Sequence, residues 1–599
     1  MVKALKTIFL IAILLGIVFV VFSPCLKGSF LYWDDQTHLV NNIDVRSFNW
    51  EGIKNIFSHE VQKTHIPFAV LSYALEFHFA GMNPFVYHLD NLLLHLFNVL
   101  LVFVLARQFG LSFLASCCSA LIFGIHLTSV EPVAWVASRK DVLYAFFYLL
   151  ALIAYVRFLT KEDRRYYWLS ILAAVLSILS KPMGLSLPLV LFIFDWYWRR
   201  RASWMMVLEK IPYFVLIIPI AWLTYRYHAR LPVPSLGEGI LTWIWCFVFY
   251  VRKFVWPFPC VPIYQMPAAF SNAEFFASVL VFLLLIGLVI YLRRNRMLVF
   301  AAAFYVVSIF YLLRFDRVAD LQVVADRFLY LSKLGFCFLA GIGLERLFHF
   351  MKTRDRIFSI TVYGLCAMLF MVFGWSAHAQ CKLWSDEERL WEYTMRLFPS
   401  SVVYQKRGDH YYFQQRYDKA MMMYAEALRL DPTNYEGMLN MATIFSINQK
   451  QQEAINILNE IIQMVPDYAP AYMNRGLVFM DMKNLDLALA DANEAIRLDV
   501  KFANAYMNRG TIYLRMNQKE KAINEYDQAI RLNPFLASAY YNRGLAWARL
   551  GNTKAAQQDF RKAIQLNPSD DQARRYLMLA EETEIWEQGR VEGVFQKTE

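Results

Sequence analysis

Long apolar runs alternate with short charged loops through the first 380 residues of the chain, and a more polar sequence follows. An apolar run of about 20 residues crosses the hydrocarbon core of a bilayer as an α-helix, because a helix satisfies its backbone polar groups internally. The pattern therefore predicts an all-α, multi-span membrane domain. We expect eleven crossings, near residues 8–22, 86–106, 111–127, 141–159, 167–180, 184–198, 211–226, 274–292, 297–313, 328–347 and 357–377.

A 34-residue spacing organises the last third of the sequence. Gly476, Gly510 and Gly544 each follow an Asn-Arg pair, and Gly408 and Ala442 continue the register upstream. This is the period of a tetratricopeptide repeat, a helical pair that buries its apolar face only by stacking on its neighbours. The small residue allows the two helices of a repeat to approach closely. Alanines with the same period fit the packing face, at positions 420, 454, 488, 522 and 556.

These patterns divide the chain into three parts. We expect a membrane domain (residues 1–380) with a long first loop (25–85), a solenoid of five repeats and a capping helix (381–590), and a flexible tail (591–599). The first loop is too long to be a simple connector. Its segments 48–59 and 67–79 mix aromatic and charged residues in the way typical of helices at a membrane surface.

Composition supports a membrane protein and argues against nucleic-acid binding. Hydrophobic residues make up 58% of the chain and aromatic residues 17%, more than a soluble globule carries. The net charge is +11, but Lys and Arg gather in short loops between apolar runs, where charge sets membrane orientation. The eight cysteines show no paired spacing and no zinc-site pattern with histidine. We therefore expect neither a disulfide framework nor a metal.

Loop charge predicts the orientation of the chain. With a cytoplasmic N-terminus and an uncleaved first span, every inner loop carries Lys or Arg, as the positive-inside rule requires. The odd number of crossings then places the first loop and the repeats on the same external face. Residues 240–250 are apolar but short, and we interpret them as an interfacial or re-entrant segment. A full crossing there would put the repeats in the cytoplasm.

Two adjacent carboxylates, Asp34 and Asp35, follow the first span and an aromatic pair. A carboxylate at the membrane interface can deprotonate an acceptor hydroxyl if partial burial raises its pKa toward the working pH. The alternative is a solvated pair at a helix end. The sequence does not decide which of the two would be the base.

Further charged residues recur at the predicted external ends of the spans. Cations should be scarce on that side, so these ones call for a ligand, and a lipid-linked phosphate suits them. The alternative is that each cation pairs with a nearby acid, such as Arg327 with Asp326. The candidates for the phosphate are Arg139, Lys181, Arg317 and Arg327, and the accompanying acids are Glu131, Asp141 and Asp326.

Polar residues elsewhere have two possible uses. Asn440, Asn474, Asn508 and Asn542 recur two residues before the small position of each repeat. Amides in such a ladder can pair with both the N–H and C=O groups of an extended peptide, or serve only hydrogen bonds among the repeats.

In the second span, Asn91 and His95 share one helix face, and we expect them to bond to neighbouring helices.

The whole chain resembles the transmembrane and tetratricopeptide-repeat O-mannosyltransferase (TMTC) family, within the GT-C superfamily of glycosyltransferases. No single motif is specific, but their order along the chain is. The matching residues are Trp33-Asp34-Asp35, Asn83-Pro84, Tyr87-His88 with Asn91 and His95, Glu131 with Arg139 and Asp141, Ser180-Lys181, Ala325-Asp326-Arg327-Phe328, and Trp384.

This resemblance implies a GT-C membrane fold, a polyprenyl-phosphate sugar donor and a Ser or Thr acceptor in a protein. The aspartate pair matches the family's acidic motif that supplies the base, and Arg139, Lys181 and Arg327 match basic positions near the donor phosphate. His65 stands where the family tends to have an arginine, so we include it in the pocket. Such departures leave the sugar open.

Our hypothesis is an inverting membrane O-glycosyltransferase that needs no metal or cofactor. Its partners would be the lipid-linked donor, membrane lipids and a protein held by the repeats. Two alternatives remain: a non-catalytic repeat scaffold for envelope assembly or export, and a GT-C enzyme that modifies a glycan or lipid. The sequence contains no Asn-x-Ser/Thr glycosylation site, which favours a bacterial cytoplasmic membrane over the endoplasmic reticulum.

Overall fold

The computed structural model describes residues 2–62, 64–228, 236–265, 273–310 and 324–587. The described residues form helices, joined by turns and short loops, and no strand. The chain separates into two compact units, Met1–Lys406 and Arg407–Glu599. Each unit has its own hydrophobic cores. Arg317 and the tail at residues 591–599 lie outside the described residues.

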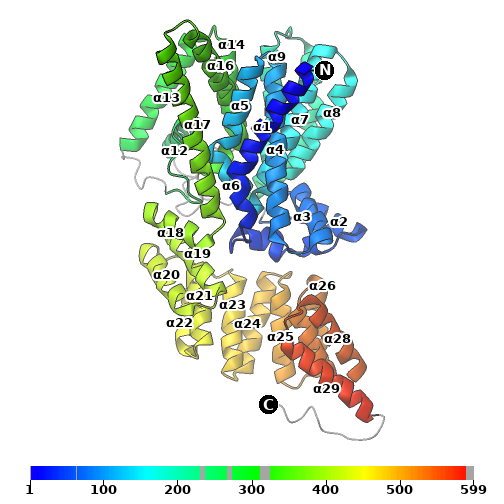
Figure 1. The fold of residues 1–599 in the computed structure, drawn as a ribbon. Coiled ribbons are helices and arrows are strands. Elements are labelled where there is room, and N and C mark those ends of the chain that lie inside the picture. Colours follow the sequence, from blue (N-terminus) through cyan, green and yellow to red (C-terminus); the bar gives the residue numbers. More distant parts are fainter. Residues whose placement is uncertain (1, 63, 229–235, 266–272, 311–323, 588–599) are drawn as a thin grey trace. The chain divides into compact units, whose positions relative to one another are not determined.

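The first unit is built from long apolar helices (Figure 1). Helix α7 packs against α4 and α8, and α5 packs against α16. A Cβ on Gly341 would lie 2.4 Å from the backbone oxygen of Ala115, so only glycine allows the close α5–α16 contact. The helices are α1 Val2–Phe22, α4 Pro84–Gln108, α5 Phe113–Ile125, α7 Arg139–Lys161, α8 Arg164–Ser180, α9 Leu187–Tyr197, α11 Ile211–His228, α12 Leu236–Val255, α13 Ala273–Tyr291, α14 Arg296–Phe310, α16 Leu334–Met351 and α17 Arg356–Trp384.

Six helical segments in the described residues are long and apolar enough to cross a membrane. A seventh candidate is a pair of helices bent by 60°. These lengths identify a membrane protein, and eleven crossings remain a prediction. Residues 240–250 lie within α12, a helix of 20 residues that also includes Glu238, Arg252 and Lys253 and is not among these segments. The six segments are Leu5–Lys27, Pro84–Gln108, Val136–Lys161, Ala273–Tyr291, Leu334–Met351 and Arg356–Trp384.

The bend lies between α5 and α6 (Val130–Ala134), at His126. Its ring accepts from the backbone N–H of Thr128 and lies 3.0 Å from the carbonyl oxygen of Phe254 through Nε2. The side chain thereby replaces backbone hydrogen bonds that the break removes. His126 thus has a structural role, and the bend turns Glu131 away from the axis of α5.

The first loop is folded rather than extended. The expected helices at 48–59 and 67–79 are present as α2 (Trp50–Ser58) and α3 (Pro67–Ala80). The side chain of Asn49 caps α2 by accepting from the N–H of Gly52, and Pro67 starts α3 at a position that needs no N–H. Shorter helices precede them, at η1 Ser23–Lys27, η2 Gln36–Val40 and η3 Ile43–Arg46.

Short helices connect the long ones. Helix α18 follows α17 after two residues, and an aspartate cap begins it: the Asp386 side chain accepts from the N–H of Arg389. The short elements are η4 Leu127–Ser129, η5 Val136–Ser138, η6 Pro182–Ser186, α10 Trp204–Leu208, η7 Asp326–Phe328, α15 Leu329–Ser332 and α18 Glu387–Leu397.

The second unit consists of helical pairs. As expected, each small residue faces the second helix of its pair: a Cβ on Gly510 or Gly544 would lie 2.8 Å from the ring of Tyr526 or Phe560. The five periodic alanines are fully buried. The helices are α19 Ser401–Phe413, α20 Tyr417–Leu430, α21 Tyr435–Ile447, α22 Gln451–Met464, α23 Ala469–Asp481, α24 Leu485–Leu498, α25 Ala503–Arg515, α26 Lys519–Leu532, α27 Ala537–Arg549, α28 Thr553–Leu566 and α29 Asp571–Glu587.

Arginines of the repeated Asn-Arg-Gly motif form a ladder of ion pairs. Arg475 binds Asp491 with two nitrogens, at 2.7 and 2.8 Å, and donates to Asn459 at 2.6 Å. Arg509 and Arg543 repeat this arrangement, as each contacts an acid 16 residues after it and a polar residue 16 residues before it. The arginines therefore link consecutive helical pairs.

Candidate functional site

The two aspartates of the first loop occupy different environments. Asp35 is 1% exposed and accepts from two backbone N–H groups, those of Leu31 at 2.8 Å and Ala137 at 2.7 Å. Asp34 is half-buried and accepts from the Nε2 of Gln62 at 3.2 Å. Asp35 thus ties the loop to the turn before α7, while Asp34 is the carboxylate that a substrate could reach.

Electrostatics also separate the pair. Burial raises the pKa of Asp35 to about 7, against the two N–H donors that oppose the shift. For Asp34, burial acts in the same direction, but the charge of Lys140 and the hydrogen bond from Gln62 oppose it, and the pKa lies below its ordinary value. Asp34 is therefore ionised at neutral pH, and the raised pKa that we expected of the base occurs at Asp35 instead.

Arg139 does not lie with the other candidate cations. Its side chain is 1% exposed and donates to Glu76 at 2.8 Å, to the carbonyl oxygen of Tyr87 at 2.8 Å and to Asn91. Every one of these groups belongs to α3 or α4, so Arg139 joins helices, and its burial corrects its assignment to a phosphate. Asn91 also donates to the carbonyl oxygen of Trp135, a structural role that we expected.

The next residue, Lys140, faces the aspartates instead. Its Nζ lies 3.1 Å from the Nε2 of His38. An ammonium group only donates, so Nε2 accepts, and the proton on Nδ1 is donated to the carbonyl oxygen of Asp34 at 3.0 Å. Burial, with Lys140 nearby, lowers the pKa of His38 to about 3 and keeps the ring neutral. His38 thereby holds Lys140 beside Asp34.

Lys181 and Arg327 complete the group of cations. Lys181 pairs with Asp141 and is 8% exposed. Burial, opposed by Asp141 and assisted by the charges of Arg327 and Lys140, lowers the pKa of Lys181 to about 8. The three cations thus lie close enough to repel one another, an arrangement that a bound anion would relieve.

Arg327 pairs with Glu131 and not with the adjacent Asp326. Its Nη1 contacts Oε1 of Glu131, and its backbone N–H donates to Oε2 at 3.0 Å. The guanidinium lies 5.3 Å from the centroid of the Trp135 ring. The bend at His126 is what brings Glu131 to this position, so both partners are fixed by short helical turns.

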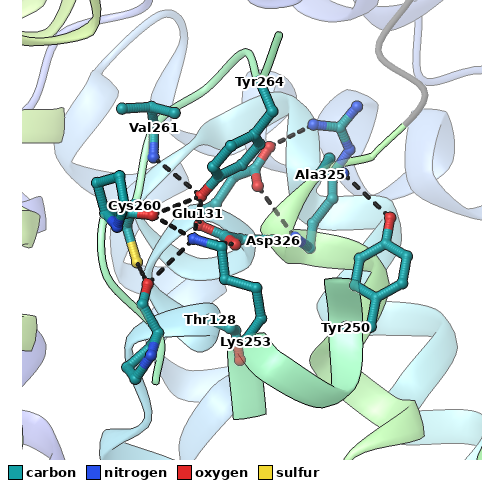
Figure 2. Close-up of polar contacts among 12 residues, drawn as sticks. Thr128, Glu131, Tyr250, Lys253, Cys260, Val261, Tyr264, Ala325 and Asp326 are labelled. Carbon is teal, nitrogen blue, oxygen red and sulfur yellow. Dashed lines mark hydrogen bonds and ion pairs between the residues drawn. The ribbon is translucent and has the colours of Figure 1, made fainter. Parts of the chain in front are cut away.

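Asp326 lies in a buried cluster of polar contacts that also includes Glu131 (Figure 2). It accepts from the hydroxyl of Tyr264 at 2.6 Å and lies 3.4 Å from the Nζ of Lys253. Lys253 also donates to Tyr264 and to the carbonyl oxygens of Pro257 and Pro259. All its partners are internal. Asp326 therefore anchors the turn that carries Arg327.

The repeat asparagines take part in hydrogen bonds within the second unit. Asn440 donates to Asp409 at 2.9 Å, and Asn474 donates to Thr443 at 3.2 Å. Asn508 is 9% exposed, and Asn542 is half-buried. The interactions at Asn440 and Asn474 favour a structural use of the ladder. His65 is half-buried in the first loop.

Comparisons with known proteins agree with this organisation. Two family models described as tetratricopeptide repeat match residues 510–581, and residues 402–434 and 469–500. Human protein O-mannosyl-transferase TMTC1 is 24% identical over 506 residues, which is 72% of this chain and 56% of that protein. Tmtc3 of Drosophila melanogaster is 23% identical, over 69% of this chain and 54% of its own length. The chain contains tetratricopeptide repeats and is similar to these TMTC proteins.

The chain spans about half the length of these relatives. F38B6.6 of Caenorhabditis elegans, also named a protein O-mannosyl-transferase, is 24% identical over 58% of this chain and 53% of its own. Among solved structures, the tetratricopeptide-repeat protein TTC0263 of Thermus thermophilus is 20% identical and covers 30% of this chain and 98% of its own, with a TM-score of 0.29.

The sequence did not single out several residues of this site. Lys140 stood beside Arg139 and Asp141, and successive helical residues point about 100° apart, so the three side chains point in different directions that the sequence does not assign. His38 lies four residues after Asp34, one turn on, which is a usable signal. Nothing in the sequence marked Lys253 or Tyr264 as part of this region. In the described part of the chain, no group of three or more His, Cys, Asp or Glu residues could hold a metal ion.

Proposed function

We propose that this protein is a membrane glycosyltransferase that moves a sugar from a polyprenyl-phosphate carrier to a Ser or Thr of a protein. The observation that carries the proposal is the position of Asp34, a half-buried carboxylate held ionised beside Lys140. Lys181 and Arg327 act electrostatically on the same region. The names of the relatives make mannose the first sugar to test.

In the proposed reaction, the carboxylate of Asp34 takes the proton of the acceptor hydroxyl. The resulting oxygen attacks the anomeric carbon of the sugar and inverts it, and the bond to the lipid phosphate breaks. The phosphate leaves with the electron pair, so negative charge grows on its oxygens. Lys140, Lys181 and Arg327 would stabilise that charge because they are fixed before the reaction begins.

The acceptor would be held by the repeats. Solenoids of helical pairs offer extended surfaces to polypeptides, and the family models match three stretches of the second unit. Within the first unit, Tyr32 of the aspartate loop donates to Glu387 of α18, the helix that follows the last apolar one. The chain thus leaves the first unit at the end that carries Asp34, which supports a single external compartment for both.

Transfer by the purified full-length protein in proteoliposomes tests this proposal. The assay would supply polyprenyl-phosphate mannose with a radioactive sugar, and a set of Ser/Thr-containing peptides. We expect transfer by the wild type and a loss of at least about 100-fold in Asp34→Asn, which keeps the shape and removes the base. Parallel reactions with glucose and N-acetylglucosamine donors would identify the sugar. Absence of transfer from all three donors would refute the proposal.

A scaffold without catalysis is the second candidate, because the matching family models describe repeats alone. It predicts that a strain carrying Asp34→Asn keeps its normal envelope proteins and their glycans. Mass spectrometry of membrane and envelope proteins from that strain and from a deletion strain separates the two cases. Glycopeptides that disappear in both strains support the enzyme.

A further inference from the structure

Helix α18 makes direct contact with the aspartate loop, although 355 residues separate them. The Oε1 atom of Glu387 accepts from the backbone N–H of Tyr32 at 3.0 Å and from the indole N–H of Trp391 at 3.3 Å. Glu387 is 6% exposed and Trp391 fully buried. One buried carboxylate oxygen thus joins the helix to the residue two positions before Asp34.

A stack of tryptophans continues from this contact toward the cations. The Trp391 ring meets Trp33 edge-on at 5.4 Å, and Trp33 stacks on Trp135 at 4.4 Å with planes 18° apart. Trp135 carries the guanidinium of Arg327 at 5.3 Å from its centroid. A rigid aromatic path therefore runs from α18, through the residue beside Asp34, to the arginine of the proposed phosphate site.

Other contacts hold α18 in place. Trp391 forms a small core with Ile263 and Val403, against which Trp33 packs. Trp384, at the end of α17, lies 5.9 Å from Trp135. Within the loop, the backbone N–H of Leu31 donates to Asp35, and the N–H of Gln36 donates to the carbonyl oxygen of Trp33, so these hydrogen bonds leave the Trp33 side chain to be held by packing. The position of the Trp33 ring therefore depends on Trp391 on one side and Trp135 on the other.

We propose, on the basis of the proposed function, that Glu387 and Trp391 are positioning residues that set the distance between the base Asp34 and the donor phosphate site. Neither residue touches a reacting atom. Glu387 fixes the loop backbone, and Trp391 presses Trp33 onto Trp135. Loss of either contact lets Asp34 move away from the attacking hydroxyl, and displacements of about 1 Å cost about 100-fold in rate.

Hydrogen–deuterium exchange on the full-length protein measures the contact between Glu387 and Tyr32 and does not depend on catalytic activity. In Glu387→Ala, the amide of Tyr32 loses its acceptor, so exchange in a peptide covering residues 30–38 should rise by at least about fivefold. Glu387→Gln keeps an acceptor oxygen and should stay near the wild-type rate. Glu392→Gln is the matched control, since Glu392 lies on the same helix in an exposed pair with Arg396.

Kinetics on the same variants give the second readout. We expect kcat to fall at least about tenfold in Glu387→Ala with a donor KM within about twofold of wild type, and Glu387→Gln to restore kcat. Trp391→Phe, which keeps a ring but loses the indole N–H, serves where the alanine variant does not fold, and should raise exchange in the same peptide.

The outcomes separate the two proposals. Unchanged exchange at residues 30–38 in both Glu387→Ala and Trp391→Phe overturns the positioning role, whatever the activity. A uniform rise in exchange over the whole first unit also overturns it, since the role would then be general stability. Suppose that exchange in the variants rises only in this peptide and that the wild-type protein transfers no sugar. The contact between α18 and the loop then stands, and only the proposed function is refuted.

Discussion

The carboxylate of Asp35 accepts a 2.7 Å hydrogen bond from the backbone N–H of Ala137, 102 residues further along the chain. The other oxygen accepts from Leu31. Asparagine at position 35 can accept only one of these bonds, and its NH2 group would face the second N–H. We therefore expect Asp35→Asn to lower the free energy of unfolding by about 1–3 kcal/mol, seen as a lower thermal midpoint in detergent.

Asp34→Asn is the matched comparison for that variant. Its side chain is half-buried and bonds to the amide of the exposed Gln62, so the thermal midpoint should stay close to wild type while transfer is lost. The opposite pattern, in which Asp35→Asn is stable and inactive and Asp34→Asn active, would make Asp35 the base.

Adjacent cations on α7 should differ in the same way. Lys140→Gln removes a charge beside Asp34 and should weaken donor binding by about tenfold or more, with little loss of stability. Arg139→Gln leaves the buried Glu76 without its cation and should cost about 3–5 kcal/mol. Donor titrations and thermal melts measure the two effects. Lys161→Gln, at the far end of the helix, is the control for the loss of a charge alone. If Lys140→Gln and Arg139→Gln lowered donor affinity and stability equally, the different roles assigned to the two cations would be wrong.

Donor affinity should depend on pH through Lys181. Its pKa is lowered to about 8, so the ammonium is charged below that pH and neutral above it. Affinity for the phosphate should therefore be greatest near pH 7 and fall as pH rises through about 8. Dissociation constants measured from pH 6.5 to 9.5 test this. Lys181→Arg stays charged over the whole range and should flatten the curve; an unchanged pH dependence in that variant would exclude Lys181 as the source.

The arginine ladder should stabilise the repeats. Arg543 contacts Asp559, whose side chain is 8% exposed, and Asp527. Arg543→Met leaves Asp559 buried without its cation, so we expect a loss of about 1–3 kcal/mol and faster amide exchange around α27 and α28. Arg497→Met, which breaks only an exposed pair with Glu494, should leave the thermal midpoint close to that of the wild type. If the two variants lost similar amounts of stability, the arginine ladder would contribute no more to stability than an exposed ion pair does.

The apolar runs and the glycine period were sufficient to predict the helices, because both patterns are local and repeat along the chain. It was harder to predict from the sequence which charged residues belong to the site. Arg139 and Lys140 are equally plausible as cations, and only the rotation of α7 decides that one meets Glu76 and the other His38. Asp34 and Asp35 differ for the same reason: the direction of each side chain follows from a loop whose shape depends on Ala137 and Glu387, distant residues that no periodicity marks.

The contacts of α18 also bear on how such proteins could be recombined. Hydropathy would suggest exchanging repeat arrays between relatives at the end of the last apolar helix, near residue 384. A graft made there would bring a foreign α18 against the native Trp33 and Trp135. A junction beyond α18 instead keeps that helix, with its contact to Trp33, in the unit to which it belongs.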